Sequence, residues 1–120
     1  MTPTTLYGIP NCDTMKRARQ WLDGAQVDYH FHDFRKHGID TTTLQQWLKQ
    51  VDWQLLLNRR GTTWRKLDAT RQQSIDTDNV CELLCQQPSM IKRPVLEHTR
   101  GLEVGFNATI YQQIFNSNSG

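Results

Sequence analysis

The first third of the chain carries a pattern that few folds accommodate. A short apolar run at residues 6–9 ends at Pro10 and predicts a strand buried on both faces. Residues 14–22 then place their apolar side chains at helical spacing, before a helix-ending Gly24. Residues 27–32 alternate apolar and polar side chains, which predicts a second strand with one solvated face. A strand, a helix and a strand within about 30 residues predict a βαβ unit with parallel strands and a right-handed crossover.

The middle of the chain, about residues 40–87, has helical patterns and hardly any strand signal. The predicted helical stretches are residues 40–51, with Asp40 in its N-terminal cap, 53–58, 64–67 and 79–87. Strands return after Pro94 as a hairpin of residues 95–98 and 102–105, and residues 108–115 form a last helix. This order, βαβ, a helical insert and then ββα, is that of a thioredoxin-like α/β fold.

Composition limits the classes of function. The 120 residues suffice for one hydrophobic core, so we expect a single domain over residues 1–120 with the insert at about 40–87. A net charge of +2 is too small to indicate nucleic-acid or membrane binding. Three cysteines without framework spacing and no visible export signal favour the reducing cytoplasm.

Cys12 stands between the first predicted strand and the first predicted helix. Unpaired amide groups and the helix dipole stabilise a thiolate at a helix N-terminus, where the pKa of a cysteine falls from about 8.5 to between roughly 3.5 and 7.5. A hydrogen bond from the Thr14 hydroxyl and the positive charges of Lys16 and Arg17 favour the thiolate, whereas the neighbouring carboxylate of Asp13 favours the neutral thiol. The alternative is that Cys12 is a small buried residue without a chemical role.

The other candidate ligands and thiols carry weaker signals. Cys81 and Cys85 lie four residues apart among apolar residues, which favours core packing; a distant resolving thiol for Cys12 is the alternative. The histidines His30, His32 and His37 form no ligand pattern with the cysteines, so no metal site is predicted. His30 and His32 share one strand face, which we expect to be solvated.

Two arginine-containing segments are candidates for anion binding. Arg59 and Arg60 follow a predicted helix and precede Gly61, where they are either solvated charges or anion ligands. Arg93 precedes Pro94 at the start of a predicted strand, where a cis peptide bond occurs in about 5–6% of cases. A guanidinium at such a turn is suited to bidentate binding of an oxyanion or a glutathione carboxylate.

Three segments, residues 6–18, 58–67 and 90–96, together resemble the ArsC/Spx/YffB group of arsenate-reductase-like proteins. Two motifs are most similar to the YffB branch: Tyr-Gly-Ile-Pro-Asn-Cys-Asp-Thr-Met-Lys at residues 7–16 and Asn-Arg-Arg-Gly-Thr-Thr at residues 58–63. Members of that branch are described as glutathione-dependent thiol reductases. The resemblance implies a mixed four-stranded sheet, a nucleophilic Cys12 and a cis Pro94. It also implies that Arg93 and Arg59 line the site.

This chain departs from the pattern of the true arsenate reductases. Residues 104–107 lack the arginine that helps those enzymes to hold the oxyanion, Asp13 replaces a glycine, and Gly8 replaces a histidine. An added carboxylate and a missing cation both disfavour an arsenate dianion. Met15 occupies the second cysteine position of the Spx motif, so Cys12 needs an external thiol to resolve its disulfides.

These observations predict a glutathione-dependent thiol oxidoreductase with one nucleophilic cysteine and with no metal or tightly bound cofactor. The expected partners are glutathione or glutaredoxin and a small-molecule or thiol substrate, with no nucleic acid and no membrane, and we expect a monomer. The alternatives are a glutaredoxin-coupled arsenate reductase and a Spx-like regulator that binds RNA polymerase. The predicted site residues are Cys12 for catalysis, and Arg59, Arg60, Arg93, Pro94 and Thr14 for substrate or glutathione binding.

Overall fold

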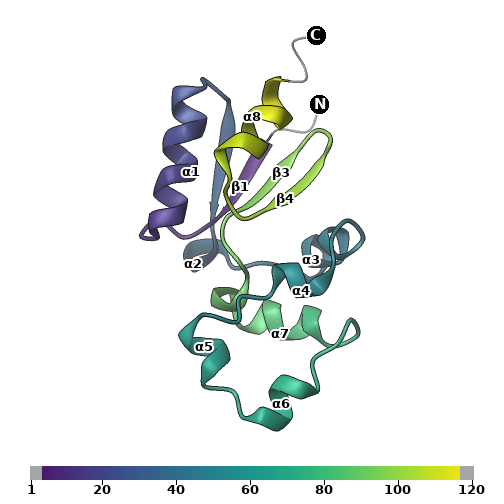
Figure 1. Ribbon diagram of the computed structural model, residues 1–120. Coiled ribbons are helices and arrows are strands. Elements are labelled where there is room, and N and C mark those ends of the chain that lie inside the picture. Colours follow the sequence, from purple (N-terminus) through teal and green to yellow (C-terminus); the bar gives the residue numbers. More distant parts are fainter. Residues whose placement is uncertain (1–3, 117–120) are drawn as a thin grey trace. The chain divides into compact units, whose positions relative to one another are not determined.

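The structure is a computed structural model that describes residues 4–116 (Figure 1). The chain forms two compact units. The first unit runs up to Asp33 and resumes at Arg93, and the second unit runs continuously from Phe34 to Lys92. The predicted helical insert therefore falls within the second unit. Among the described residues, no helix is long and apolar enough to cross a bilayer.

The first unit is built on a mixed four-stranded sheet in the order β2-β1-β3-β4. Strand β1 (Thr4–Gly8) pairs in parallel with β2 (Tyr29–Asp33), and α1 (Asp13–Gly24) connects them. Strand β3 (Val95–His98) runs antiparallel both to β1 and to β4 (Gly101–Val104), and α8 (Ala108–Asn116) follows. The βαβ unit, the hairpin and the mixed four-stranded sheet predicted from the sequence are confirmed.

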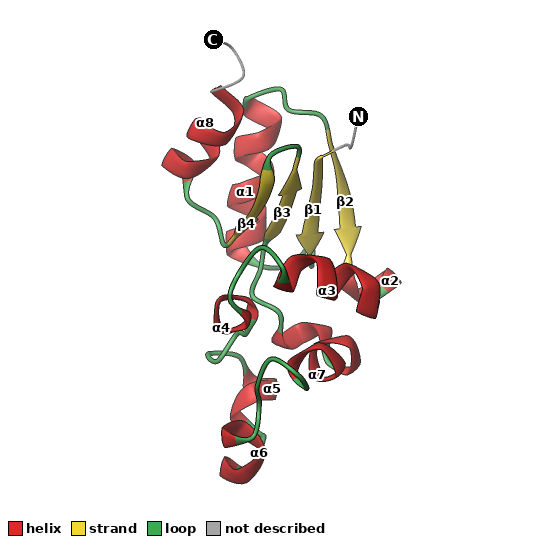
Figure 2. Ribbon diagram, turned by 90° about the vertical axis from the view of Figure 1, so that its right-hand side faces the viewer, coloured by secondary structure: helices red, strands yellow, loops and turns green. Residues whose placement is uncertain are grey.

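The core of the first unit lies between the sheet and its two helices. Figure 2 shows α1 and α8 on the same side of the sheet. Alternate strand residues reach this face, because successive side chains of a strand point to opposite faces. The fully buried members of the cluster are Leu6, Met15, Ala18, Leu22, Leu96 and Tyr111.

The opposite face of β1 is only partly covered. Tyr7 is half-buried; its hydroxyl donates a hydrogen bond to Glu97 Oε1 at 3.1 Å, and its ring lies 4.8 Å from that of His32. The prediction that this strand is buried on both faces is therefore wrong, because the phenol end of Tyr7 belongs to a polar cluster. On β2, His30 is exposed as expected, whereas His32 is half-buried by this ring contact.

The second unit consists of short helices. They are α2 (Phe34–His37), α3 (Thr41–Leu48), α4 (Trp53–Leu56), α5 (Thr62–Arg65), α6 (Ala69–Gln73), α7 (Val80–Gln86) and the 3-10 helix η1 (Pro88–Met90). Three of them begin at an aspartate whose side chain accepts a backbone hydrogen bond, as N-terminal caps do: Asp40, Asp52 and Asp68. Helices α3 and α7 pack against each other, and Leu44 and Leu84 are fully buried there.

The two cysteines of α7 do not lie in the core. Cys81 and Cys85 are half-buried, and both sulfurs approach Thr41 at the start of α3. The Cys81 Sγ lies 3.8 Å from the Thr41 carbonyl oxygen, and the Cys85 Sγ lies 3.5 Å from the Thr41 hydroxyl. Burial raises the pKa of Cys81, and the neighbouring Cys85 adds to this rise. The prediction of core packing is wrong because helical spacing puts both thiols on the flank that faces Thr41.

Candidate active site

Cys12 caps the N-terminus of α1, as the sequence predicted. Its backbone is extended, with φ −112° and ψ 134°, and its carbonyl oxygen accepts a hydrogen bond from the Lys16 amide at 2.9 Å. Strand β1 ends at Gly8, and Pro10 follows two residues later. Proline has no amide hydrogen with which to continue the strand pairing. The thiol is half-buried, so it is screened from bulk water and still reachable from one side.

The surroundings of the Cys12 sulfur favour the thiolate on balance. Burial by itself raises the pKa of this thiol. The backbone amides of Met15 and Thr14, together with the Arg93 guanidinium, outweigh burial and hold the Cys12 pKa below its ordinary value. Because these amides lower the pKa, they stabilise the thiolate more than the neutral thiol. The carboxylate of Asp13 is exposed and does not reverse this balance.

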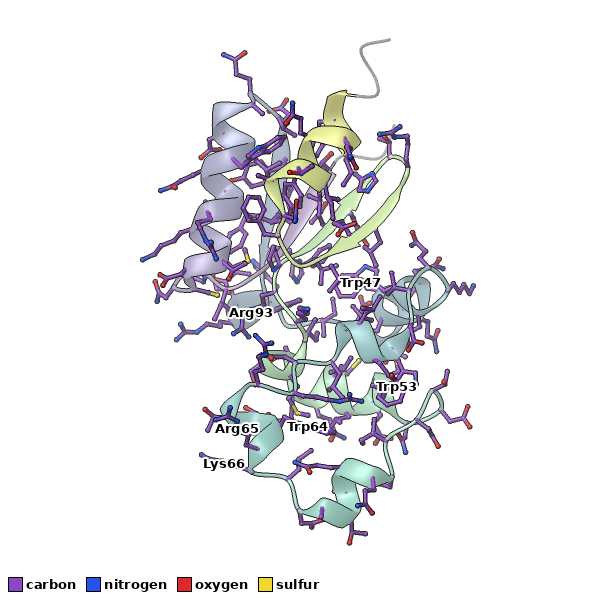
Figure 3. All side chains as sticks on the ribbon, viewed as in Figure 1. Trp47, Trp53, Trp64, Arg65, Lys66 and Arg93 are labelled. Carbon is purple, nitrogen blue, oxygen red and sulfur yellow. The ribbon has the colours of Figure 1, made fainter. Side chains whose placement is uncertain are left out.

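Arg93 reaches Cys12 because two strand ends meet at one edge of the sheet. Strand β1 ends at Gly8 before the loop to Cys12, and β3 begins just after Arg93. Since the two strands are antiparallel, with Tyr7 opposite Val95, the end of one lies beside the start of the other. Arg93 is half-buried at this edge, where Figure 3 labels it.

Pro94 anchors this arrangement. The Arg93–Pro94 peptide bond is cis, as the family resemblance implied, and Pro94 is buried. The Pro94 carbonyl oxygen accepts a hydrogen bond from the Gly105 amide at 2.8 Å, which ties it to the residue after β4. Gly105 has φ +87°, a conformation that glycine adopts without strain.

A second group of cations lies in the other unit. Residues 56–58 pair with residues 90–92: the Lys92 amide donates to the Leu56 carbonyl at 2.7 Å, and the Asn58 amide donates to the Met90 carbonyl at 2.7 Å. This pairing brings Arg59, Arg60 and Lys92 around a pocket of about 240 Å³.

A backbone turn and the ring of Trp53, which does not itself line the pocket, contact the two arginines of this pocket. The Asn58 side-chain oxygen accepts a hydrogen bond from the Arg60 amide at 3.1 Å, which forms a tight turn. The Arg59 guanidinium lies 5.9 Å from the ring centroid of Trp53, a cation–π distance. Three cations around one small pocket suit a carboxylate or another oxyanion.

The predicted site residues therefore form two groups, one in each unit. Cys12, Thr14, Arg93 and Pro94 come together in the first unit, with Thr14 acting through its backbone amide. Arg59 and Arg60 belong to the second unit, where Lys92 joins them. Within residues 4–116, no group of three or more His, Cys, Asp or Glu side chains is arranged to hold a metal ion.

Two contributors were not predicted from the sequence. The first is the backbone amide of Met15, the third residue of α1, where amides have no partner within the helix. The predicted start of this helix was the signal that could have identified it. Lys92 required knowledge of the pairing between residues 56–58 and 90–92, for which the sequence carries no signal.

Residues 7–114 match the model of the ArsC family. The chain belongs to the ArsC family. It is 49% identical to the solved structure of the YFFB (PA3664) protein, with a TM-score of 0.87 over 92% of this chain and 96% of that one. An uncharacterized protein of Haemophilus influenzae is 40% identical over 111 residues, which cover 92% of this chain and 97% of that protein.

A more distant relative is the global transcriptional regulator Spx of Streptococcus agalactiae. It is 26% identical over 105 residues, which cover 86% of this chain and 76% of the regulator. Together with the observed sheet, the match to the YFFB structure establishes the expected thioredoxin-like α/β fold.

Proposed function

We propose that this ArsC-family chain is a glutathione-dependent thiol oxidoreductase whose nucleophile is Cys12. One observation carries the proposal: two backbone amides and the Arg93 guanidinium act on a single half-buried sulfur and lower its pKa. A lowered pKa increases the thiolate fraction near neutral pH, and the thiolate is the form that attacks sulfur. The resemblance of residues 7–16 and 58–63 to the YffB branch, whose members are described as glutathione-dependent thiol reductases, supports the same assignment.

The reaction that fits one nucleophilic cysteine is the reduction of a mixed disulfide between glutathione and a second thiol. The Cys12 thiolate attacks the glutathione sulfur, a new sulfur–sulfur bond forms, and the second thiol leaves as its thiolate. A glutathione thiolate then attacks the glutathione sulfur of the Cys12 disulfide. Glutathione disulfide is released and the Cys12 thiolate returns. In the net reaction one glutathione thiolate is consumed, the second thiol is released in reduced form, and the mixed disulfide is replaced by glutathione disulfide.

The remaining site residues have positioning and binding roles in this proposal. Arg93 stabilises the Cys12 thiolate and, with its fork of donors, is suited to a carboxylate of the bound glutathione. Thr14 stabilises the sulfur through its backbone amide, and Pro94 is the residue next to Arg93, joined to it by the cis peptide bond. The family resemblance assigns Arg59 to the anionic part of glutathione or substrate, and Arg60 is the alternative for this role. Charge removal at the arginine that binds is expected to raise KM for glutathione.

The decisive experiment measures release of glutathione disulfide from a glutathionylated peptide. We expect turnover by the parent protein and its loss in Cys12→Ser, while Cys81→Ser and Cys85→Ser serve as matched controls that retain it. Arg93→Ala is expected to raise the pKa of Cys12 and to slow its attack on the glutathionylated peptide. Arg17→Ala, at an exposed position of the helix that Cys12 caps, is the control and is expected to leave the pKa and the rate of attack nearly unchanged. Full turnover in Cys12→Ser would sink the proposal.

Glutaredoxin-coupled arsenate reduction is the alternative within the same enzyme class, favoured by membership of the ArsC family. Residues 104–107 contain no arginine, so a bound arsenate has one cation fewer to stabilise it. Arsenate turnover with glutaredoxin that is sensitive to Arg93→Ala would favour this alternative, and absence of turnover would remove it.

A second candidate from another class is a regulator that docks on RNA polymerase, favoured by the similarity to Spx. The test is the binding of the purified chain to purified RNA polymerase. A stoichiometric complex that forms equally well with Cys12→Ser would favour docking over catalysis.

A further inference from the structure

The side chain of Met15 packs directly across Gly8. A Cβ atom added at Gly8 would lie 2.3 Å from the Met15 sulfur and 2.7 Å from the Met15 terminal methyl carbon. Both distances are far below van der Waals contact, so the two side chains cannot both be present in this arrangement. Gly8 is itself buried within β1, and its φ lies outside the left-handed region, so the requirement for glycine is one of space.

Met15 lies within the packed core of the first unit. It is fully buried, and its cluster contains Leu6, Ala18 and Leu22, which are also fully buried. Protein cores are close-packed, so a displaced thioether would have to press on these neighbouring side chains or on the backbone of its own helix rather than fill a void. The absence of a side chain at Gly8 therefore sets the depth at which the first turn of α1 packs on the sheet.

The backbone of Met15 belongs to the turn that carries Cys12. Cys12 is the capping residue of α1, and Met15 is the third residue inside the helix. The amides of Thr14 and Met15 are the two backbone donors that act on the Cys12 sulfur. The residue that fills the space over Gly8 thus also presents one of these donors.

We propose that Met15, seated against Gly8, is a positioning residue that fixes the first turn of α1 so that two backbone amides face the Cys12 sulfur. The two positions act as a pair: a small residue at position 8 and a large one at position 15 fill one space. Met15 also occupies the position of the second cysteine in the Spx motif. A disulfide formed by Cys12 therefore has to be reduced by an external thiol. This inference rests on the proposed role of Cys12 as the nucleophile.

The test is a double-mutant cycle in the full-length chain with the Cys12 pKa as its readout. The variants are Gly8→Ala, Met15→Ala and the double variant, each in a Cys81→Ser/Cys85→Ser background so that only Cys12 reacts. The pH dependence of alkylation gives the Cys12 pKa, and urea unfolding confirms that each variant is folded. Gly24→Ala is the matched glycine control, because a Cβ there meets nothing within 4 Å. Met90→Ala, a methionine 1% exposed in the second unit, controls for the loss of a buried methionine.

We expect Gly8→Ala to raise the Cys12 pKa by about one unit, which is about a tenfold smaller thiolate population well below both values. Met15→Ala alone is expected to raise the Cys12 pKa by less than Gly8→Ala, because the turn loses its packing without a clash. In the double variant the pKa is expected to fall back from the Gly8→Ala value to that of Met15→Ala, because the clash is gone. A folded Met15→Ala variant that keeps the parent pKa would show that Met15 does not position the turn. The controls are expected to match the parent. The inference fails if folded Gly8→Ala keeps the parent pKa, or if the double variant is shifted as far as Gly8→Ala alone.

A second comparison covers the case in which Gly8→Ala does not fold. Without the methionine side chain, the added methyl group at position 8 has room, so Met15→Ala and the double variant are expected to share one Cys12 pKa. A clear difference between them would overturn the inference. The alkylation measures the thiol and not turnover, so a parent protein without glutathione activity would overturn the proposed function while leaving this cycle interpretable.

Discussion

The hydroxyl group of Tyr111 is buried without a hydrogen-bond partner among the described residues. The side chain is fully buried, and its ring makes edge contacts with Trp21 and Phe106. Burial raises the pKa of Tyr111 above its ordinary value of about 10, and the charge of Glu103 adds to the rise. An unsatisfied hydroxyl lowers the free energy of unfolding, because the unfolded chain returns it to water.

Tyr111→Phe removes this hydroxyl and keeps the ring. We expect the free energy of unfolding near neutral pH to rise by about 1 kcal/mol. Above pH 10 the unfolded chain releases the phenol proton while the folded chain keeps it, so the parent loses stability as pH rises and the variant is spared this loss. Urea unfolding from pH 7 to 11 measures both effects. A difference between the two proteins that stays constant above pH 10 would contradict this assignment.

The residues of the site differ in how far the sequence alone reveals them. Cys12 could be placed because an apolar run, a proline and a helical period all lie within a short stretch. The proximity of Arg93 to Cys12 came from family resemblance, since it depends on the antiparallel pairing of β1 with β3. The packing of Met15 on Gly8 escaped prediction because it is a matter of a few ångströms between two elements.

At the scale of the helices, Asp40 is a capping residue whose removal should have a measurable effect. Its Oδ1 accepts a hydrogen bond from the Thr43 amide at 2.8 Å at the start of α3. We expect Asp40→Ala to lower the free energy of unfolding by about 1 kcal/mol, and Asp40→Asn to lose much less because it keeps the acceptor. Urea unfolding is the measurement. Equal losses in the two variants would show that charge, rather than the cap, is what Asp40 contributes.

The elements that the sequence reveals are those that carry an apolar pattern. Helices α1, α3 and α8 and the β3–β4 hairpin were all predicted, within a few residues at their ends. Helices α2 and α6 were missed because α2 has a single buried side chain, Phe34, and α6 has none, whereas the equally short α4 was predicted from its adjacent leucines. Strand β1 was predicted to be buried on both faces because Tyr7 is an aromatic residue within an apolar run. In the structure the Tyr7 hydroxyl donates a hydrogen bond to Glu97, so this face is only partly buried.

At the scale of the whole molecule, the two units differ in how far apart along the chain their contacting segments lie. The second unit is one continuous stretch, Phe34–Lys92. The first unit is assembled from two stretches that β1 and β3 join, with Leu6 opposite Leu96. Pairing these strands closes a loop that contains the whole second unit. Closure of a long loop costs conformational entropy before any contact compensates for it.

This difference predicts an order of folding. In pulsed hydrogen exchange during refolding from urea, we expect the amides of α3 and α7 to become protected before those of the β1–β3 ladder. The β3–β4 ladder is the internal control, since its strands are adjacent in the chain and its amides should also be protected early. If both ladders lagged together, strand formation itself would be slow and loop closure would not be the cause. Protection of the β1–β3 ladder before α3 and α7 would refute the prediction, because the most distant segments would then have met first.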